Sequence, residues 1–176
     1  MNVSVRQEQP SDYQLTEKVI ERAFSTVEIS DKTEHEMVSL LRRSEAFVPE
    51  LSLVAEGNEI VGHILLTKVN IVNENEKVES LALAPVSVVS EFQSKGIGKR
   101  LIEEALRKAK ELGFESVIVL GHPTYYPKFG FKKASILGIK PPFEVPDEVF
   151  MALELKESAL DGVSGVVEYP REFFGG

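Results

Sequence analysis

Apolar residues recur at every third or fourth position in three stretches of the chain, which is the spacing of an amphipathic helix. Helices are therefore predicted from residues 10–12 onward, over 34–43 and over 99–112, with Ser11 or Asp12 capping the first. The third is the most regular. The apolar positions are Leu15, Val19, Ile20 and Phe24 in the first helix, Met37, Leu40 and Leu41 in the second, and Leu101, Ile102, Ala105, Leu106, Ala109 and Leu112 in the third.

Strands are predicted where apolar residues alternate with polar ones or run together between turn residues. A Gly-Asn turn at 56–59 favours a hairpin, and a second polar turn at 73–76 adds a third antiparallel strand. Helix 99–112 lies between the third of these strands and a short, fully apolar one, so the two should run parallel. The predicted strands are 3–7, 51–55, 60–72, 78–89, 116–120, 150–155 and 166–169.

Pro85 interrupts the strand at 78–89. Proline has no N–H to donate to a sheet, so it marks either a bulge or the end of the strand. We expect a bulge, because Val86, Val88 and Val89 continue the β-branched pattern beyond it. An antiparallel meander, one crossover helix and further strands together predict a mixed α/β (α+β) fold, with the whole chain forming a single domain.

Three segments lack a regular pattern. Residues 24–33 are expected to form an irregular loop, 121–131 contain one short helix at most, and 140–147 form a proline-rich loop. Because loops carry much of the substrate specificity of enzymes, the first and third of these segments are candidates for a lid.

Composition narrows the classes of function. The chain carries 20 Lys and Arg against 28 Asp and Glu, a net charge of −8, which argues against a nucleic-acid partner and is compatible with an amine substrate. The absence of cysteine excludes disulfides and a cysteine nucleophile, and the scattered histidines give no metal-site spacing. The amino terminus does not resemble a signal peptide and no apolar run could span a membrane, so we expect a cytoplasmic protein without a membrane partner.

The segment Gln93-Ser94-Lys95-Gly96-Ile97-Gly98-Lys99-Arg100 follows a strand and opens the most regular helix. Its two glycines allow a tight turn, and the free N–H groups at the helix start favour a phosphate or pyrophosphate. The turn lacks the third glycine of a dinucleotide fingerprint and the Lys-Ser/Thr pair of a P-loop. Its three basic residues add positive charge, although solvated helix-start residues would give the same pattern.

The segment 93–98 resembles the acyl-CoA pyrophosphate signature of the GNAT N-acetyltransferase superfamily, a Gln or Arg two residues before a basic residue and a Gly-x-Gly pair. Residues 83–92 are similar to the strand and loop that precede this signature. Residues 125–131 are similar to a later motif with a tyrosine four residues before the glycine of a Gly-Phe pair. The order of these motifs, with one helix and one buried strand between them, is more specific than any one motif.

The resemblance covers residues 3–156, is strongest over 78–131 and is greatest to the bacterial YhbS-like branch, with 157–176 as a C-terminal extension. It implies a GNAT-type mixed, mostly antiparallel sheet with flanking helices, splayed between the fourth and fifth strands. The pantetheine arm of acetyl-CoA would lie in that gap, with the N–H of Val88 polarising the acetyl carbonyl. The residues that the resemblance assigns to the acetyl-CoA site are Val86, Ser87, Val88, Gln93, Ser94, Lys95, Gly96, Ile97, Gly98, Lys99, Arg100 and Tyr126.

The resemblance also assigns Tyr126 as the general acid that protonates the thiolate of CoA, and a core aromatic residue is the alternative reading of this position. The general base is not identified by the sequence. Glu79 and His122 are candidates from the fourth and fifth strands, His63 is a further one, and a chain of ordered waters could serve instead.

These features predict an acetyl-CoA-dependent N-acetyltransferase that moves the acetyl group directly to an amine in a ternary complex, with acetyl-CoA as the co-substrate. The acceptor would be a small-molecule or peptide amine. Two alternatives stay open: a non-catalytic module that binds or senses acyl-CoA, and a nucleotide-binding α/β domain of another lineage. A homodimer is also left open by the sequence.

Overall fold

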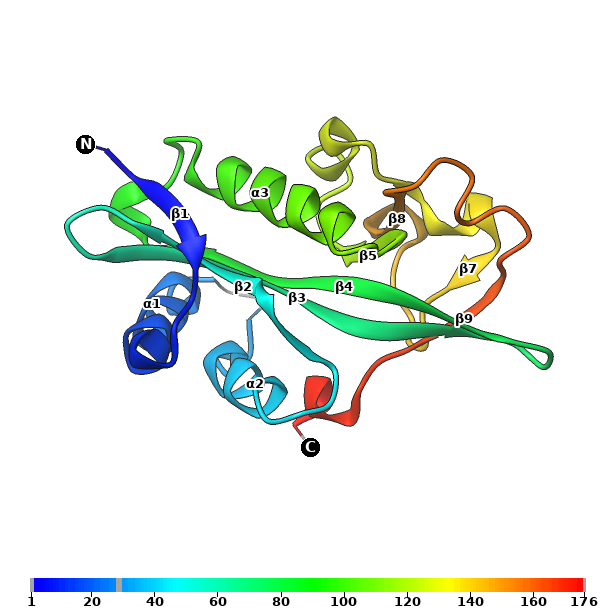
Figure 1. Cartoon of the computed structure of the whole chain (residues 1–176), viewed down its shortest axis with the longest axis horizontal. Helices are drawn as coiled ribbons and strands as arrows, with labels where there is room; N and C mark the ends of the chain where they lie inside the picture. The colour runs from blue at the N-terminus through cyan, green and yellow to red at the C-terminus, as the bar shows by residue number, and fades with distance from the viewer. Residues whose placement is uncertain (1, 28–29, 176) are drawn as a thin grey trace.

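A computed structural model describes residues 2–27 and 30–175, which form one nine-stranded sheet with helices on both faces (Figure 1). Helix α3 (Ile97–Glu111) covers one face, and α1 (Tyr13–Phe24) and α2 (Glu34–Leu41) cover the other. The strands are β1 (Ser4–Gln7), β2 (Phe47–Glu56), β3 (Ile60–Val72), β4 (Lys77–Val88), β5 (Ser116–Leu120), β6 (Lys132–Lys133), β7 (Ile139–Lys140), β8 (Phe150–Glu154) and β9 (Gly165–Glu168).

The strand order in the sheet is β1-β2-β3-β4-β5-β8-β6, and β9 pairs with both β3 and β7. Strands β1 to β4 are antiparallel, whereas β4 and β5 are parallel and are connected through α3. The predicted mixed, mostly antiparallel sheet with one parallel crossover is therefore confirmed. No helix among the described residues is long and apolar enough to cross a membrane.

The irregular connections contain short 3-10 turns that the sequence pattern did not resolve. Phe173, in the last of these turns, packs against α2 and the sheet, so the C-terminal segment covers the same face as α1 and α2 (Figure 1). The turns are η1 (Pro10–Asp12), η2 (Ser90–Phe92), η3 (Tyr126–Phe129), η4 (Ala134–Leu137), η5 (Asp147–Val149) and η6 (Arg171–Phe174).

The loop predicted at residues 24–33 connects α1 to α2. Two of its residues, Glu28 and Ile29, lie outside the part of the chain that the structure describes, and so do the terminal residues Met1 and Gly176.

Two of the predicted apolar positions are exposed. Leu15 is 53% exposed, while Thr16 and Ala23 of the same helix are buried, so the face of α1 that packs on the sheet is rotated from the predicted one. Leu112 is 40% exposed because α3 ends at Glu111 and its last turn no longer directs that side chain to the sheet. Neither residue therefore contributes fully to the core.

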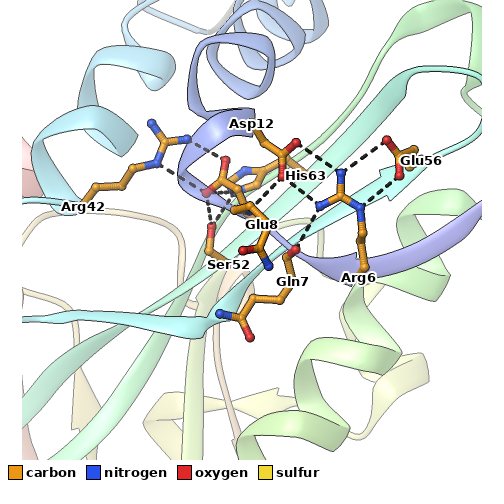
Figure 2. A network of polar contacts seen from close by, with 9 residues as sticks. Arg6, Gln7, Glu8, Asp12, Arg42, Ser52, Glu56 and His63 are labelled. Carbon is orange, nitrogen blue, oxygen red and sulfur yellow. Dashed lines mark hydrogen bonds and ion pairs between the residues drawn. The ribbon is translucent and has the colours of Figure 1, made fainter.

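The polar residues before α1 do not cap that helix as predicted. The carboxylate of Asp12 instead accepts a hydrogen bond from the backbone N–H of Gln9 at 2.8 Å and pairs with Arg6, also at 2.8 Å. Hydrogen bonding to Arg6 holds the pKa of Asp12 below its usual value. Because Arg6 also reaches Glu56 at 2.9 Å, this group joins β1, β2 and the start of α1 (Figure 2).

The bulge expected at Pro85 is present. Two residues of β4, Ala84 and Pro85, lie opposite the single β3 residue Leu65. The extra residue changes the alternation of side chains along β4: odd-numbered apolar residues pack toward α3 before the bulge, and even-numbered ones do so after it. The bulge thus decides which side chains of the second half of β4 face α3.

A buried polar network lies on the face of the sheet opposite α3 (Figure 2). The carboxylate of Glu8 accepts hydrogen bonds from Arg42 at 2.7 Å and from the Ser52 hydroxyl at 2.7 Å, and Ser52 Oγ lies 3.0 Å from His63 Nε2. The side chains of Glu8 and His63 are 0% exposed. Burial lowers the pKa of His63 from 6.5 to about 4, although the nearby Glu8 carboxylate opposes this shift.

We predict that His63 makes the protein less stable in acid. The unfolded chain binds a proton at this residue near pH 6.5 and the folded chain only near pH 4, so stability is lost as the pH falls through this interval. The loss should reach about 3 kcal/mol in the free energy of unfolding. Urea unfolding of the wild type and His63→Gln between pH 4 and 8 measures it, and parallel curves for the two proteins would contradict the prediction.

Candidate functional site

Strands β4 and β5 separate from each other near the middle of the sheet. They pair in parallel at Leu81 with Val117 and at Ala82 with Ile118, after which β4 continues to residue 88 with no further pair to β5 among the described residues. The bulge at Pro85 begins just where this pairing ends. A gap therefore opens between the two strands, as expected for the fold.

The hydrogen bonds of β4 to β3 show which backbone groups face this gap. The N–H of Val89 donates to the carbonyl of Val61 at 2.9 Å, and Ser87 lies opposite His63 two residues earlier. Since alternate residues of a strand point their N–H groups in opposite directions, those of Val86 and Val88 face away from β3 and toward the gap. The backbone of β4 thus presents N–H donors on the side where β5 no longer pairs with it.

The glycine turn lies beside the end of β4. Ser94 and Gly96 have positive φ angles of 62° and 82°, and the Gln93 side-chain amide donates to the Val88 carbonyl at 2.9 Å. The first helical bond of this turn runs from the Arg100 N–H to the Gly96 carbonyl at 3.1 Å, so the N–H groups before Arg100 lie at the free end of the helix. This end of α3 therefore offers donors to an anion.

The glycine turn and the end of β4 line the same cavity, which has a volume of about 460 Å³. Lys99 is on its wall, whereas Arg100 donates to the carbonyl of Val3 at 2.6 Å and Lys95 lies 5.6 Å from the ring of Phe92. Of the three basic residues around the turn, Lys99 is therefore the one that borders the cavity. The lining residues are Val88, Phe92, Gln93, Ser94, Gly96, Ile97, Gly98, Lys99 and Tyr125.

The two adjacent tyrosines of the later motif occupy different environments. Tyr126 is 7% exposed, packs edge-on against Phe131 at 5.6 Å and fills the space where a side chain at Gly121 would lie. Burial raises the pKa of Tyr126 to about 12. Tyr125 instead lines the cavity, with its hydroxyl oxygen 4.0 Å from the position that a Cβ on Gly98 would take.

Tyr125 was not among the site residues predicted from the sequence. The sequence did contain an indication that Tyr125 could reach the site. Two consecutive aromatic residues in a tight turn point in different directions, so one of them is expected to face away from the core. Spacing to the Gly-Phe pair favoured the second tyrosine, and only the packing of Tyr126 against Gly121 shows that the first one reaches the cavity.

The three candidates for a general base lie in different surroundings. Glu79 is nine residues before Val88 on β4, which corresponds to about 25–30 Å along a strand, and it lines a separate cavity of about 540 Å³ beside Glu168. His122 is exposed just after β5, with Nδ1 2.9 Å from the Thr124 hydroxyl. His63 is buried on β3 next to β4. The structure thus does not bring Glu79 to the gap.

Comparison with known proteins gives a consistent family assignment. The model of the acetyltransferase (GNAT) family matches residues 13–131. The uncharacterized N-acetyltransferase YjhQ of Escherichia coli is 39% identical over 118 residues, a match that spans 65% of either chain. The uncharacterized N-acetyltransferase YhbS of the same organism is 28% identical over 171 residues, which cover 96% of this chain and 97% of that one.

Two solved structures extend this similarity over the whole fold. Escherichia coli YhbS in complex with CoA aligns with a TM-score of 0.88 at 26% identity over 99% of this chain and 93% of that one. A GNAT family acetyltransferase from Brucella melitensis in complex with acetyl-CoA aligns with a TM-score of 0.81 at 32% identity, covering 98% of each chain. With its diverging strands and glycine turn, the chain belongs to the acetyltransferase (GNAT) family, whose co-substrate is acetyl-CoA, and to its YhbS-like branch.

Proposed function

We propose that the protein is an N-acetyltransferase that binds acetyl-CoA between β4 and β5 and transfers the acetyl group directly to an amine. The observation that carries this proposal is that Val88 of the open strand and Gly98 of the helix start line the same cavity. One extended ligand can therefore reach the N–H groups of both. The complexes of its relatives with CoA and acetyl-CoA support the choice of ligand.

In this proposal the glycine turn holds the diphosphate. The N–H groups from Ser94 to Lys99 surround the start of α3, where the helix dipole favours negative charge, and Lys99 adds a positive charge on the cavity wall. Ile97 is buried and anchors the first turn of the helix in the core. The turn is thereby fixed in place before the ligand arrives, which lowers the entropic cost of binding.

The open edge of β4 would hold the acetyl end. The N–H groups of Val86 and Val88 face the gap, where the one at Val88 can donate to the acetyl carbonyl. Negative charge develops on that oxygen when an amine attacks, so a fixed donor stabilises the transition state more than the ground state. Ser87, between them, points its backbone groups toward β3 and would meet the ligand less directly.

Tyr126 is the proposed general acid. Because burial raises its pKa to about 12, its hydroxyl keeps its proton at neutral pH and can give it to the departing thiolate. Tyr125 lies at the phosphate end of the cavity, where its hydroxyl would donate a hydrogen bond to the diphosphate or the pantetheine arm. The acceptor is proposed to be a small-molecule or peptide amine, in line with the net charge of −8.

Release of free CoA from acetyl-CoA in the presence of a panel of amines tests the proposed activity, and calorimetry with CoA tests binding separately. A non-catalytic module would bind CoA tightly without releasing it on any amine. A nucleotide-binding domain would bind ATP or NAD in preference to CoA. Either result would contradict the proposal.

Gly98→Asp should weaken CoA binding by about tenfold or more, because a carboxylate would face the diphosphate at the helix start. Calorimetry with CoA measures the change. Gly98→Ala is the matched control: its Cβ would lie 3.9 Å from Val88 Cγ2 and 4.0 Å from the Tyr125 hydroxyl, so the free protein accommodates it. If the aspartate variant bound CoA as well as the alanine variant, the turn would not be the cofactor site.

The adjacent tyrosines provide a matched pair of variants. Tyr126→Phe should lower kcat by about 100-fold with little change in CoA affinity, because it removes the proton donor alone. Tyr125→Phe should weaken CoA binding about fivefold, the value of one hydrogen bond, and leave kcat nearly unchanged. Steady-state kinetics and calorimetry on both variants measure these effects, and the opposite pattern would exchange the two roles.

A further inference from the structure

The buried network of Figure 2 contains a histidine nitrogen without a partner. The Ser52 hydroxyl carries a single proton, and it donates this proton to the Glu8 carboxylate at 2.7 Å. In its 3.0 Å contact with His63 Nε2, Ser52 can therefore only accept. It follows that Nε2 carries the proton of the neutral ring and that Nδ1 has a free lone pair.

This free lone pair lies next to the strand of the proposed acetyl site. His63 on β3 is directly opposite Ser87 on β4, and the Cβ atoms of such cross-strand pairs are about 5 Å apart on the same face. Ser87 is 2% exposed, and its hydroxyl oxygen is buried without a hydrogen-bond partner among the described residues. A buried donor and a buried acceptor, both unpaired, thus belong to neighbouring residues of two strands, with no hydrogen bond between them.

The position of Ser87 relates this pair to the reaction. Ser87 lies between Val86 and Val88, whose side chains pack toward α3, so its own side chain points to the opposite face of the sheet. The proposed diphosphate site is at the start of α3. If the cofactor occupies the side of α3, an amine that attacks the acetyl group from the opposite side would approach the face to which Ser87 and His63 belong.

We propose that Ser87 and His63 form a proton relay that accepts the proton lost by the attacking amine. This inference rests on the proposed acetyltransferase function and supplies the base that the sequence did not identify. It makes Ser87 the group nearest the reacting nitrogen and His63 the residue that acts through it.

The relay conserves every proton. As the C–N bond forms, the amine proton passes to Ser87 Oγ, directly or through one water, while the Ser87 proton passes to His63 Nδ1. The C–S bond breaks and the thiolate takes the proton of Tyr126. After the amide leaves, the imidazolium returns its proton through Ser87 and water to the Tyr126 phenolate.

Burial disfavours an imidazolium at His63, and the charged groups around the ring act on it in opposite directions. The Glu8 carboxylate lies 4.0 Å from Nε2 and stabilises a positive ring, whereas Arg42 opposes it and is itself paired with Glu8 and Glu17. Ser52 on β2 and Ser87 on β4 are neutral. At neutral pH the ring is uncharged and available as an acceptor, and the adjacent carboxylate offsets part of the cost of charging it.

Ser87→Ala tests the relay. The hydroxyl has no partner in the folded protein, so its removal should leave the melting temperature unchanged or raise it and leave CoA affinity unchanged. We expect kcat to fall about 100-fold, and the remaining rate to increase more steeply with hydroxide concentration between pH 6 and 9 than the wild-type rate does. Thr67→Val is the matched control, because Thr67 on β3 also has a buried, unpaired hydroxyl but lies opposite Ala82.

Three outcomes would overturn the relay: a wild-type rate for Ser87→Ala, an equal loss in Thr67→Val, or a proton on Nδ1 in the ¹⁵N spectrum of histidine-labelled free protein. The spectrum needs no substrate, so it decides on the relay independently of the acetyltransferase function. Absence of turnover by the wild type on every amine, with Nε2–H observed, would instead refute the proposed function.

Discussion

The departure of β5 from β4 after the Ala82–Ile118 pair is the constraint on which the proposed site depends. An unpaired strand edge inside a protein leaves backbone donors and acceptors that need partners. Here the edge ends beside the free N–H groups of a helix start, within one cavity. The fold thus collects two sets of unsatisfied backbone donors in one place, and an acyl thioester with a diphosphate can satisfy both.

The bulge at Pro85 sets the orientation of this edge. Without the extra residue, the side chains of Val86 and Val88 would exchange faces with that of Ser87. Apolar side chains now pack under α3, the N–H groups of Val86 and Val88 face the gap, and a hydroxyl enters the opposite face. One bulge therefore determines which side chains of the second half of β4 face α3 and which face the opposite side of the sheet.

The face covered by α1 and α2 is unusual for a core because it contains a carboxylate, a guanidinium and an imidazole. Glu8 and Arg42 compensate each other at 2.7 Å, so the charged pair is tolerated in the interior. His63 is the least stabilised member of this group. Burial keeps its ring neutral, and Nδ1 of the ring has no hydrogen-bond partner among the described residues. Such an unpaired group is costly for stability, and a catalytic role is one explanation for its presence in a folded protein.

Local patterns in the sequence determined most of the elements and the glycine turn, because helix periodicity, strand alternation and turn residues act over a few neighbouring positions. They predicted β5, the hairpins, the bulge and the start of α3 to within a few residues. The two-residue strands β6 and β7 have no such pattern and form only because β8 and β9 lie next to them. Likewise, which of Tyr125 and Tyr126 lines the cavity depends on packing at Gly121, and the network of His63, Ser52 and Glu8 joins β3, β2 and the residue after β1. These features depend on residues far apart in the chain, so only the tertiary structure could decide them.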